Sequence, residues 1–312
     1  MPELPEVETI VRGLNKKIRG RKIIDTWTDW PKYFKLHKTE KEFRKHVIGK
    51  KILGVERRAK NVLIHLSGGH LLLVHQKMSG HLIVGKWQEI RNTKQKNKEQ
   101  LPEKWVGQKW FPTAPKNSPL WDPMNRFIRL IFFLDNKEML ALSDLRRFAK
   151  VLCAPREIIF NLPEFRGLGP EPLDPKFTFS RFKDLFKNKK GKIKPLLMDQ
   201  SFISGIGNIY ADEIMWFSKI HPLRRIEKLK NKEIETIFKA IKFILKKALR
   251  LRGSSVDDYR DAEGRRGTYD LSRYVYQREG EPCPRCGVDI KRLKIGGRSA
   301  HYCPKCQKLN SK

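Results

Sequence analysis

The chain lacks the features that would place it in a membrane or outside the cell. Its 312 residues contain no apolar run of the roughly 20 residues that span a bilayer, and no apolar signal segment follows the acidic start. It has only five cysteines, four of them in two close pairs, which excludes a disulfide-stapled secreted scaffold. We therefore expect a cytoplasmic protein with no membrane partner.

Acidic residues are scarce relative to basic ones. The chain has 34 aspartates and glutamates against 67 lysines and arginines, which gives a formal net charge of +33. Such an excess suits a polyanionic partner such as nucleic acid. A generally basic proteome or association with ribosomes would produce the same excess, so the charge indicates a class of partner and no activity.

The order of periodic segments predicts an α+β fold. A length of 312 residues predicts about two domains. Apolar residues at helical spacing between residues 7 and 18, ended by Gly20, predict a first helix. Several short β-branched runs with tight turns then favour an antiparallel β-sandwich. The strands are predicted at 51–58, 61–66, 70–75, 81–84, 129–134, 138–143 and 148–152.

Composition divides the chain into four parts. We expect a β-sandwich domain at 1–154, a proline-rich linker at 155–175, a helical domain at 176–280 and a cysteine-containing hairpin at 281–312. A polar insertion at about 86–125 contains four tryptophans, which either pack locally or lie in a disordered loop. Within the helical domain we predict helices at 180–188, 194–199, 209–217 and 234–249, and a polar loop at 252–268.

The cysteine spacing indicates a metal site. Cys283 and Cys286 are separated by sixteen residues from Cys303 and Cys306, which matches a four-cysteine zinc site. Four thiolates complete a tetrahedral coordination shell, so one zinc ion would be structural. A pair of redox dithiols is the alternative. Cys153 stands alone in an apolar stretch, where we expect a buried, unreactive thiol.

The first eight residues would acquire chemistry if the initiator methionine were removed. A proline at position 2 favours removal, which would leave the secondary amine of Pro2 beside the carboxylate of Glu3. An α-amino group titrates at about 7.7–8.0, so a neutral, nucleophilic fraction exists near pH 7. The structural alternative is that Pro5 occupies the first turn of a helix and the glutamates complement its dipole.

Two further segments are typical of nucleic-acid contacts. Residues 205–208, Gly-Ile-Gly-Asn, precede a predicted helix, and such a helix start can direct backbone N–H groups at a phosphate. A plain helix hairpin is the alternative. Upstream lysines, including Lys189, form either a solvated basic face or part of the same phosphate site. Met78 lies in a polar turn and Arg146 and Phe148 in another, and such groups can fill the gap left by an extruded base.

Taken in order, these motifs resemble the formamidopyrimidine-DNA glycosylase family along nearly the whole chain except the insertion. The related endonuclease-eight-like enzymes share the amino-terminal motif and the helix-two-turn-helix. The formamidopyrimidine branch is favoured by the complete amino-terminal motif and by the Met-Ser-Gly and Arg-Arg-Phe motifs. The resemblance rests on residues 1–8, 57–60, 78–80, 146–148, 205–213, 278–287 and 297–307.

The resemblance implies a bifunctional DNA glycosylase and abasic-site lyase. Such an enzyme removes 8-oxoguanine and formamidopyrimidines from damaged double-stranded DNA and nicks the strand by β,δ-elimination. It would act as a monomer bound to DNA in the cytoplasm, with a helix-two-turn-helix domain and a zinc-finger hairpin. The matching positions would be the nucleophile Pro2, the acid Glu3, the phosphate or elimination residues Lys60 and Arg298, the phosphate contacts Lys189 and Asn208, and the gap-filling residues Met78, Arg146 and Phe148.

Four positions depart from the pattern of this family. Leu145 and Ala149 stand where proline and glycine are usual, Phe127 lies where a DNA-contacting histidine is common, and Lys77 replaces a glycine. None of these positions is catalytic, so the departures bear on selectivity for the opposite base. Two alternative functions remain at this stage: an endonuclease-eight-like enzyme for oxidised pyrimidines, and a non-catalytic lesion-binding protein.

Overall fold

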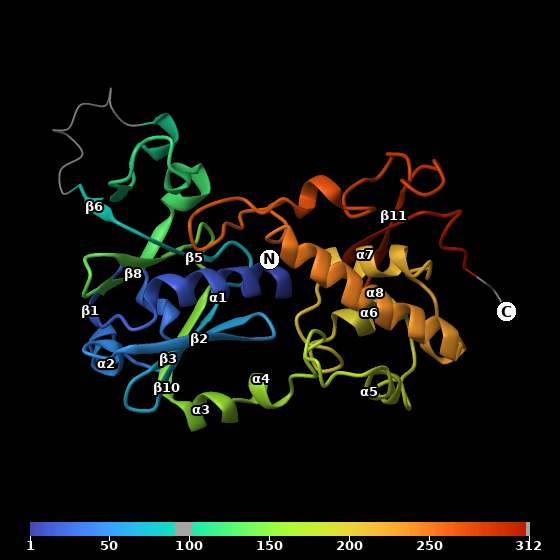
Figure 1. Cartoon of the computed structure of the whole chain (residues 1–312), viewed down its shortest axis with the longest axis horizontal. Coiled ribbons are helices and arrows are strands. Elements are labelled where there is room, and N and C mark those ends of the chain that lie inside the picture. Colours follow the sequence, from blue (N-terminus) through green and yellow to red (C-terminus); the bar gives the residue numbers. More distant parts are fainter. Residues whose placement is uncertain (91–101, 310–312) are drawn as a thin grey trace. The chain divides into compact units, whose positions relative to one another are not determined.

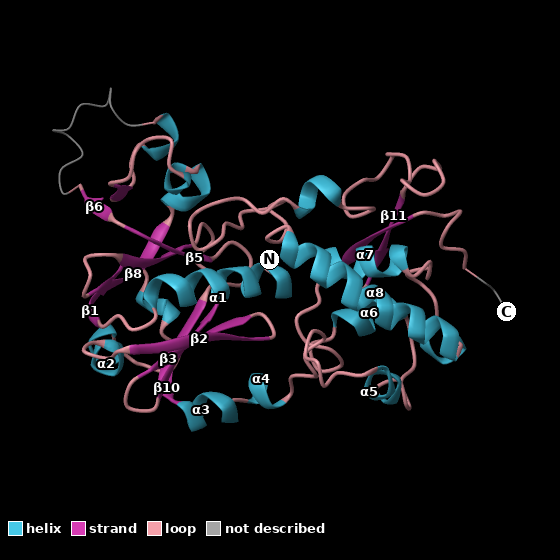
Figure 2. Cartoon of the chain, in the orientation of Figure 1, coloured by secondary structure: helices cyan, strands magenta, loops and turns pink. Residues whose placement is uncertain are grey.

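A computed structural model describes residues 1–90 and 102–309. The predicted insertion therefore lies partly outside the described residues, since positions 91–101 belong to it. The chain forms two compact units: Met1–Phe165 with Arg252–Thr268, and Arg166–Leu251 with Tyr269–Lys312. Figures 1 and 2 show the course of the chain and its elements. Among the described residues, no helix combines the length and the apolarity needed to cross a bilayer.

The first unit is an antiparallel β-sandwich with an amino-terminal helix, as predicted. Its two four-stranded sheets have the strand orders β1-β8-β9-β5 and β10-β4-β3-β2. Every predicted strand is present, with ends shifted by a few residues, and β1 is an additional strand. The strands are β1 (Ile23–Thr28), β2 (Ile52–Arg58), β3 (Asn61–Leu66), β4 (His70–His75), β5 (His81–Gly85), β8 (Ile128–Leu134), β9 (Met139–Ser143) and β10 (Lys150–Pro155).

The core of this unit lies between the two sheets and beneath helix α1 (Leu4–Ile18). The apolar stripe of α1 is buried with the inward residues of both sheets, and Cys153 is buried in the same cluster as predicted. Helix α2 (Glu40–Val47) adds Phe43 and Val47 to this core. Because side chains alternate along a strand, Leu82 of β5 faces this core while Ile83 faces a second cluster outside the sheet.

The described part of the insertion covers that outer face. Strands β6 (Trp87–Glu89) and β7 (Trp110–Pro112) pair with each other, and both tryptophans join Ile83 in the second cluster. The short helices η3 (Glu103–Trp105), η4 (Pro119–Trp121) and η5 (Pro123–Arg126) follow in the same segment. The rings of Trp105 and Trp121 lie 5.1 Å apart. Local packing of the tryptophans, rather than a disordered loop, therefore describes this part of the insertion.

Two connecting segments differ from their sequence-based descriptions. The segment expected as a linker at 155–175 contains two short helices, α3 (Arg156–Asn161) and α4 (Pro163–Arg166). The polar loop at 252–268 has no regular secondary structure but belongs to the first unit. Its Ala262 is buried in the sandwich core, and the backbone N–H of Val84 donates to Ala262 O at 2.9 Å. This loop is therefore packed along the sandwich.

The second unit is helical and ends in a two-stranded hairpin. Its predicted helices are present as α5 (Phe179–Asp184), α6 (Ile193–Met198), α7 (Asn208–Phe217) and α8 (Asn231–Arg250), with the short η6 (Ile226–Lys228) and η7 (Tyr269–Ser272). The hairpin consists of β11 (Lys291–Ile295) and β12 (Arg298–Tyr302). Gly296 and Gly297 connect them with φ values of 54° and 76°, a conformation that glycine adopts without strain.

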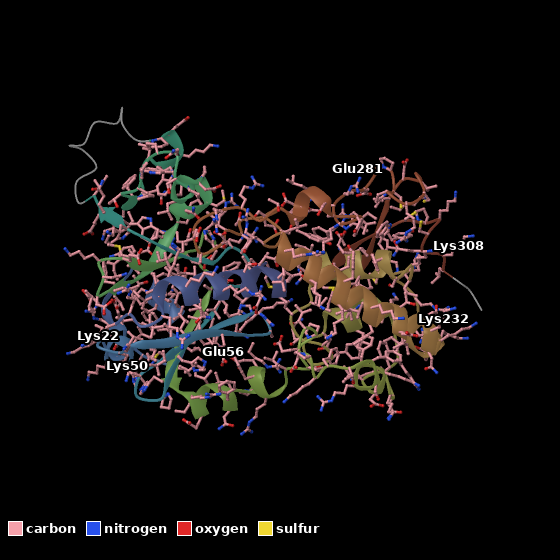
Figure 3. All side chains as sticks on the ribbon, in the orientation of Figure 1. Lys22, Lys50, Glu56, Lys232, Glu281 and Lys308 are labelled. Carbon is pink, nitrogen blue, oxygen red and sulfur yellow. The ribbon has the colours of Figure 1, made fainter. Side chains whose placement is uncertain are left out.

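Exposed charge is present on both units. Lys22 on the first unit and Lys232 and Lys308 on the second are exposed, and Figure 3 shows their side chains at the surface. Both units therefore present cationic side chains to solvent, and the net charge of +33 of the whole chain favours association with a polyanion.

Candidate active site and nucleic-acid interface

The amino terminus lies at the start of helix α1. Met1 is 39% exposed, whereas Pro2 and Glu3 are buried. The backbone N–H of Glu3 donates to Glu6 Oε2 at 2.8 Å, and Pro5 occupies the first turn, so the helix start is fixed as the sequence predicts. The residue following Met1 is therefore held rigidly at the positive end of a helix.

Glu6 joins the amino terminus to the loop at 252–268. Its second carboxylate oxygen, Oε1, accepts from the backbone N–H of Ser254 at 2.7 Å, and the side chain is 1% exposed. Gly253 has a φ of +77°, and a Cβ there would lie 2.6 Å from Glu6 Oε1. Glycine is therefore required for the close approach, and Glu6 organises two backbone segments in addition to complementing the helix dipole.

Lys60 lies in the tight turn between β2 and β3. It is 6% exposed, and the preceding Ala59 has a φ of 54°. Arg57 connects this turn to α1, because its guanidinium donates to Glu8 Oε2 and to Ala59 O, each at 3.0 Å. The ion pair between Arg57 and Glu8, whose side chains are largely shielded from solvent, therefore sets the position of Lys60 relative to α1.

The electrostatic field around this turn is positive. Burial, together with the charges of Lys77 and Lys60, lowers the pKa of His75 to about 3. His75 is therefore neutral at physiological pH and adds no charge next to Lys60. A cluster of cations beside a neutral imidazole suits an anionic ligand such as a phosphate.

Met78, Arg146 and Phe148 lie on two neighbouring turns of the first unit. The Arg146 guanidinium lies 3.6 Å from Met78 Sδ, and the backbone N–H of Arg146 donates to Ser79 Oγ at 3.0 Å. Met78 and Phe148 are 40% and 56% exposed, which is unusual for large apolar side chains. A substantial part of the Met78 side chain is therefore available to a partner.

Asp144 holds these two turns together, a role the sequence did not reveal. It is fully buried and accepts from Ser79 Oγ at 2.5 Å, from Tyr33 Oη at 3.0 Å and from the backbone N–H of Ala149 at 2.9 Å. Ala149, one of the departures, packs in the core with its N–H satisfied, so alanine is accommodated here. The signal available in the sequence was only an aspartate two residues before Arg146.

In the second unit, Asn208 is the first residue of α7 and follows a turn fixed by Gln200. The Gln200 amide donates to Ile206 O at 2.8 Å and accepts from the N–H of Gly205 at 2.9 Å. Gly205 has a φ of 88°. Asn208 Oδ1 is buried without a hydrogen-bond partner among the described residues. Lys189 is exposed on the turn after α5.

A buried charge network connects the helices to the hairpin that carries Arg298. Lys194 of α6 and Asp212 of α7 form an ion pair at 2.7 Å with exposures of 1% and 0%. Asp212 Oδ2 also accepts from the backbone N–H of His301 at 2.9 Å, and Lys194 donates to the carbonyl of Ser299. Arg298 itself is exposed at the start of β12. Its backbone position is therefore set by Lys194 and Asp212.

Replacing Lys194 with alanine is expected to destabilise the second unit by about 3–5 kcal/mol, because Asp212 would keep a buried charge without its cation. Denaturant unfolding, followed by hydrogen exchange in α6, α7 and β12, measures this loss. The control is Lys187→Ala, which removes an ion pair to Asp184 of similar length whose two side chains are 76% and 56% exposed. Equal stability of the Lys194 variant and the wild type would contradict the assigned role.

The four paired cysteines form a zinc-finger site. Their Sγ atoms all lie within 4.8 Å of one another, and Cys283 and Cys303 are buried while Cys286 and Cys306 are partly exposed. The indole N–H of Trp216 donates to Cys283 Sγ at 3.3 Å, which is the kind of donor that a metal-bound thiolate accepts. Four thiolates fit one tetrahedral zinc and leave no coordination position for water, so the zinc is structural.

The predicted site residues are divided between the two units. The first unit carries Pro2, Glu3 and Lys60 near α1, with Met78, Arg146 and Phe148 on adjacent turns. The second unit carries Lys189, Asn208, Arg298 and the zinc cysteines. Sequence reasoning missed the organising residues Asp144, Asp212 and Ser254, which have partners far away along the chain, and Gln200, whose partners are only five and six residues away. For Glu6, the spacing from Glu3, typical of a capping box, was a local signal in the sequence.

Known proteins resemble this chain along its whole length. Residues 1–151 match the family model of the formamidopyrimidine-DNA glycosylase N-terminal domain and residues 168–260 that of the H2TH domain. Residues 280–309 match the zinc finger found in FPG and IleRS. A formamidopyrimidine-DNA glycosylase of Pelotomaculum thermopropionicum is 38% identical over 99% of this chain and 100% of its own.

Solved structures with the same fold contain DNA. A Lactococcus lactis FPG mutant in complex with DNA containing Fapy-dG superposes with a TM-score of 0.80 and 29% identity, covering 99% of this chain and 100% of its own. A complex between Lactococcus lactis Fpg and DNA containing an abasic site gives a TM-score of 0.80 and 29% identity, covering 98% and 100%. The expected order of β-sandwich, helix-two-turn-helix and zinc hairpin agrees with these structures.

Proposed function

Because the chain belongs to the formamidopyrimidine-DNA glycosylase family, we propose that it excises oxidised purines from duplex DNA and cleaves the strand at the resulting abasic site. The observation that carries the proposal is the placement of Pro2 and Glu3, both buried at the start of α1 and fixed through Glu6. The substrates are 8-oxoguanine and formamidopyrimidines. One chain carries every proposed group, so the enzyme acts as a monomer in base excision repair.

The first step uses the secondary amine of Pro2, which becomes available when Met1 is removed. The neutral amine attacks C1′ of the damaged nucleotide as the glycosidic bond breaks. The base leaves with the bonding electrons and takes up the proton that the substituted amine nitrogen loses. Glu3 donates a proton to the sugar ring oxygen, so that the ring opens and the amine nitrogen forms an iminium with C1′. This iminium has no N–H proton to lose and therefore persists as an electron sink.

The iminium then permits cleavage of the strand. It acidifies C2′, and loss of a C2′ proton expels the 3′ phosphate by β-elimination; a second elimination expels the 5′ phosphate. Lys60 and Arg298 stabilise the negative charge of the leaving phosphates. The partly exposed ion pair of Arg57 and Glu8 holds the turn of Lys60 against the helix that presents Pro2.

The remaining predicted residues hold the DNA in the distorted form that the chemistry requires. Lys189 and Asn208 bind backbone phosphates, Lys189 through its ammonium group and Asn208 through N–H donors at the start of helix α7. Met78 and Phe148 enter the space vacated by the damaged nucleotide, and Arg146 pairs with the orphaned cytosine. Their large exposed apolar areas support this assignment.

Borohydride trapping on a duplex with 8-oxoguanine opposite cytosine tests the proposal. Borohydride reduces the iminium to a stable amine, so we expect a covalent adduct between the DNA and the amino-terminal residue. Protein that retains Met1, as shown by its intact mass, serves as the control and is expected to form no adduct. Absence of adduct from processed chain would contradict the lyase mechanism. Faster excision of thymine glycol than of 8-oxoguanine would indicate an endonuclease-eight-like substrate range instead.

A further inference from the structure

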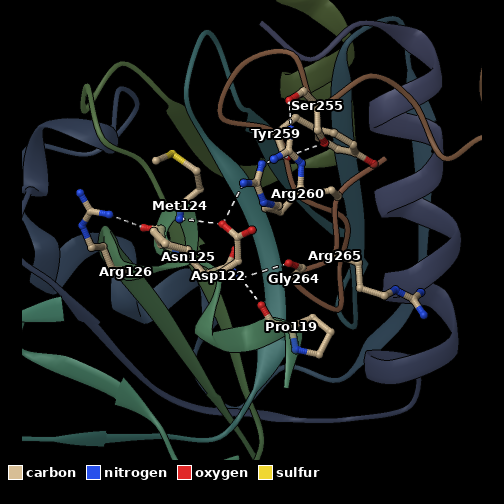
Figure 4. A network of polar contacts seen from close by, with 12 residues as sticks. Pro119, Asp122, Met124, Asn125, Arg126, Ser255, Tyr259, Arg260, Gly264 and Arg265 are labelled. Carbon is tan, nitrogen blue, oxygen red and sulfur yellow. Dashed lines mark hydrogen bonds and ion pairs between the residues drawn. The ribbon is translucent and has the colours of Figure 1, made fainter. Parts of the chain in front are cut away.

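The end of the insertion contacts the loop at 252–268, although the two segments are separated by more than a hundred residues in the sequence. Asp122, which directly precedes η5, forms an ion pair with Arg260 of the loop, with 2.8 Å between Oδ1 and Nη2. Their side chains are 20% and 6% exposed. Figure 4 shows Asp122 directed at Arg260 among the contacts of this region.

Asn125 provides a second connection at the same place. It is fully buried, its amide donates to Gly264 O of the loop at 3.2 Å, and its Oδ1 contacts His81 Nε2 of β5 at 2.9 Å. Gly264 has a φ of +81°, and a Cβ there would lie 2.6 Å from Asn125 Nδ2. Asn125 thus bridges a strand of the sandwich and the loop, and the loop backbone is shaped to receive it.

The other end of this loop lies against the amino terminus. Ser254 donates its N–H to Glu6, whose other oxygen accepts from the N–H of Glu3. Asp257 Oδ2 lies 3.4 Å from the Met1 amino group. The charges of the amino terminus and of Arg146 also act on the carboxyl of Asp258, whose pKa is raised chiefly by burial. The stretch 253–258 therefore borders the amino terminus, next to Pro2.

Few residues of this loop are free to move independently of its two anchors. Ser255 Oγ donates to Tyr259 O at 2.8 Å and accepts from the N–H of Gly267 at 2.9 Å, which closes the loop on itself. Tyr259 is 4% exposed and Ala262 1%, both within the sandwich core. A displacement of Arg260 would therefore be transmitted to residues 253–258 through a short, internally bonded segment.

We propose that Asp122 and Asn125 are positioning residues that hold the stretch 253–258 beside the amino-terminal amine and the base being released. This inference rests on the proposed function. Residues 119–126, called the brace below, would then support the loop from outside. Their effect would depend on the substrate, because an intact damaged nucleotide places a base next to the amine and an abasic site does not. The brace should matter for base excision and be dispensable for cleavage of a preformed abasic site.

The test compares single-turnover rates of Asp122→Asn and wild-type enzyme on two duplexes, one with 8-oxoguanine and one with a preformed abasic site. Asparagine keeps the size of the side chain and removes the charge that pairs with Arg260. We expect excision to slow by about 10- to 100-fold, because a misplacement of about 1 Å can cost about 100-fold, while abasic-site cleavage stays at the wild-type rate. Amide hydrogen exchange at 253–268 should rise without a change in α1.

Two further variants complete the design. The double variant with Arg260→Gln and Asp122→Asn should slow excision no more than either single variant, since each single change already breaks the same ion pair. Glu89→Gln is the matched control: it removes the ion pair of 2.9 Å to Lys109 on the β6–β7 ribbon of the same insertion and should change neither rate.

Three outcomes would overturn the inference. Excision by Asp122→Asn at the wild-type rate would show that the brace does not position the loop. An equal fall of both rates together with the melting temperature would assign the pair a purely structural role. A wild-type enzyme that is active on neither duplex would overturn the proposed function itself, and this inference with it.

Discussion

Glu3→Gln is expected to slow excision of 8-oxoguanine by about 10²- to 10⁴-fold, the usual contribution of a positioned general acid. Glutamine has nearly the shape of glutamate, and the Glu3 backbone N–H would keep its bond to Glu6, so the helix start is preserved. What the variant loses is the proton that the carboxylic acid gives to the sugar ring oxygen. Single-turnover excision assays on an 8-oxoguanine duplex measure the effect.

The same variant should retain more activity on a preformed abasic site. An abasic sugar already interconverts between its ring and open-chain aldehyde forms, so the amine can form the iminium without an acid to open the ring. Glu56→Gln, a change at an exposed glutamate of β2 paired with His65, controls for the loss of one carboxylate and should be silent. Undiminished excision by Glu3→Gln would remove Glu3 from the proposed chemistry.

The elements predicted from sequence are those whose signal is local. The stripe of α1 and the cysteine spacing each specify their own structure from the sequence nearby, and both structures are present. Strand β1 was not predicted from the sequence. Buried and exposed side chains do not alternate regularly along it, and its register with β8 shifts between Ile23 and Asp25. Its pairing partner lies about a hundred residues away, which no local pattern reveals.

The loop at 252–268 illustrates the same limit within the candidate site. Its composition is polar and glycine-rich, and the prediction of a loop was correct as far as local structure goes. Arg260 and Asp261 are nevertheless 5% and 3% exposed. Polar residues can be buried when each finds a partner. Asp122 of another segment pairs with Arg260, whereas Asp261 pairs with Arg265 of the same loop. Asn125 and Glu6 supply partners from other segments to the loop backbone. The candidate chemical groups were thus visible in the sequence, whereas the residues that position them were not.

Loss of the zinc ion is expected to unfold the terminal hairpin and abolish strand cleavage. Structural zinc sites in finger peptides bind with an apparent free energy of about 10–16 kcal/mol at pH 7, and this energy is also folding energy. A small apolar cluster flanks the β11–β12 hairpin, and Cys283 and Cys303 are themselves members of it. Without the metal, this cluster cannot hold the hairpin, and Arg298 loses its fixed place near the leaving phosphates.

Cys303→Ala is the variant that tests this prediction, because Cys303 is fully buried and lies 3.4 Å from the sulfur of Cys286. We expect its zinc content, measured by mass spectrometry of the native protein, to fall from one ion per chain to almost none. Proteolysis should then begin within residues 280–309, and cleavage of an abasic-site duplex should be lost. Cys153→Ala removes an equally buried thiol from the sandwich core and should keep its zinc. A Cys303 variant that stays resistant to protease and still cleaves the strand would show that the hairpin does not depend on the metal, and Arg298 would then have to be held by Lys194 and Asp212 alone.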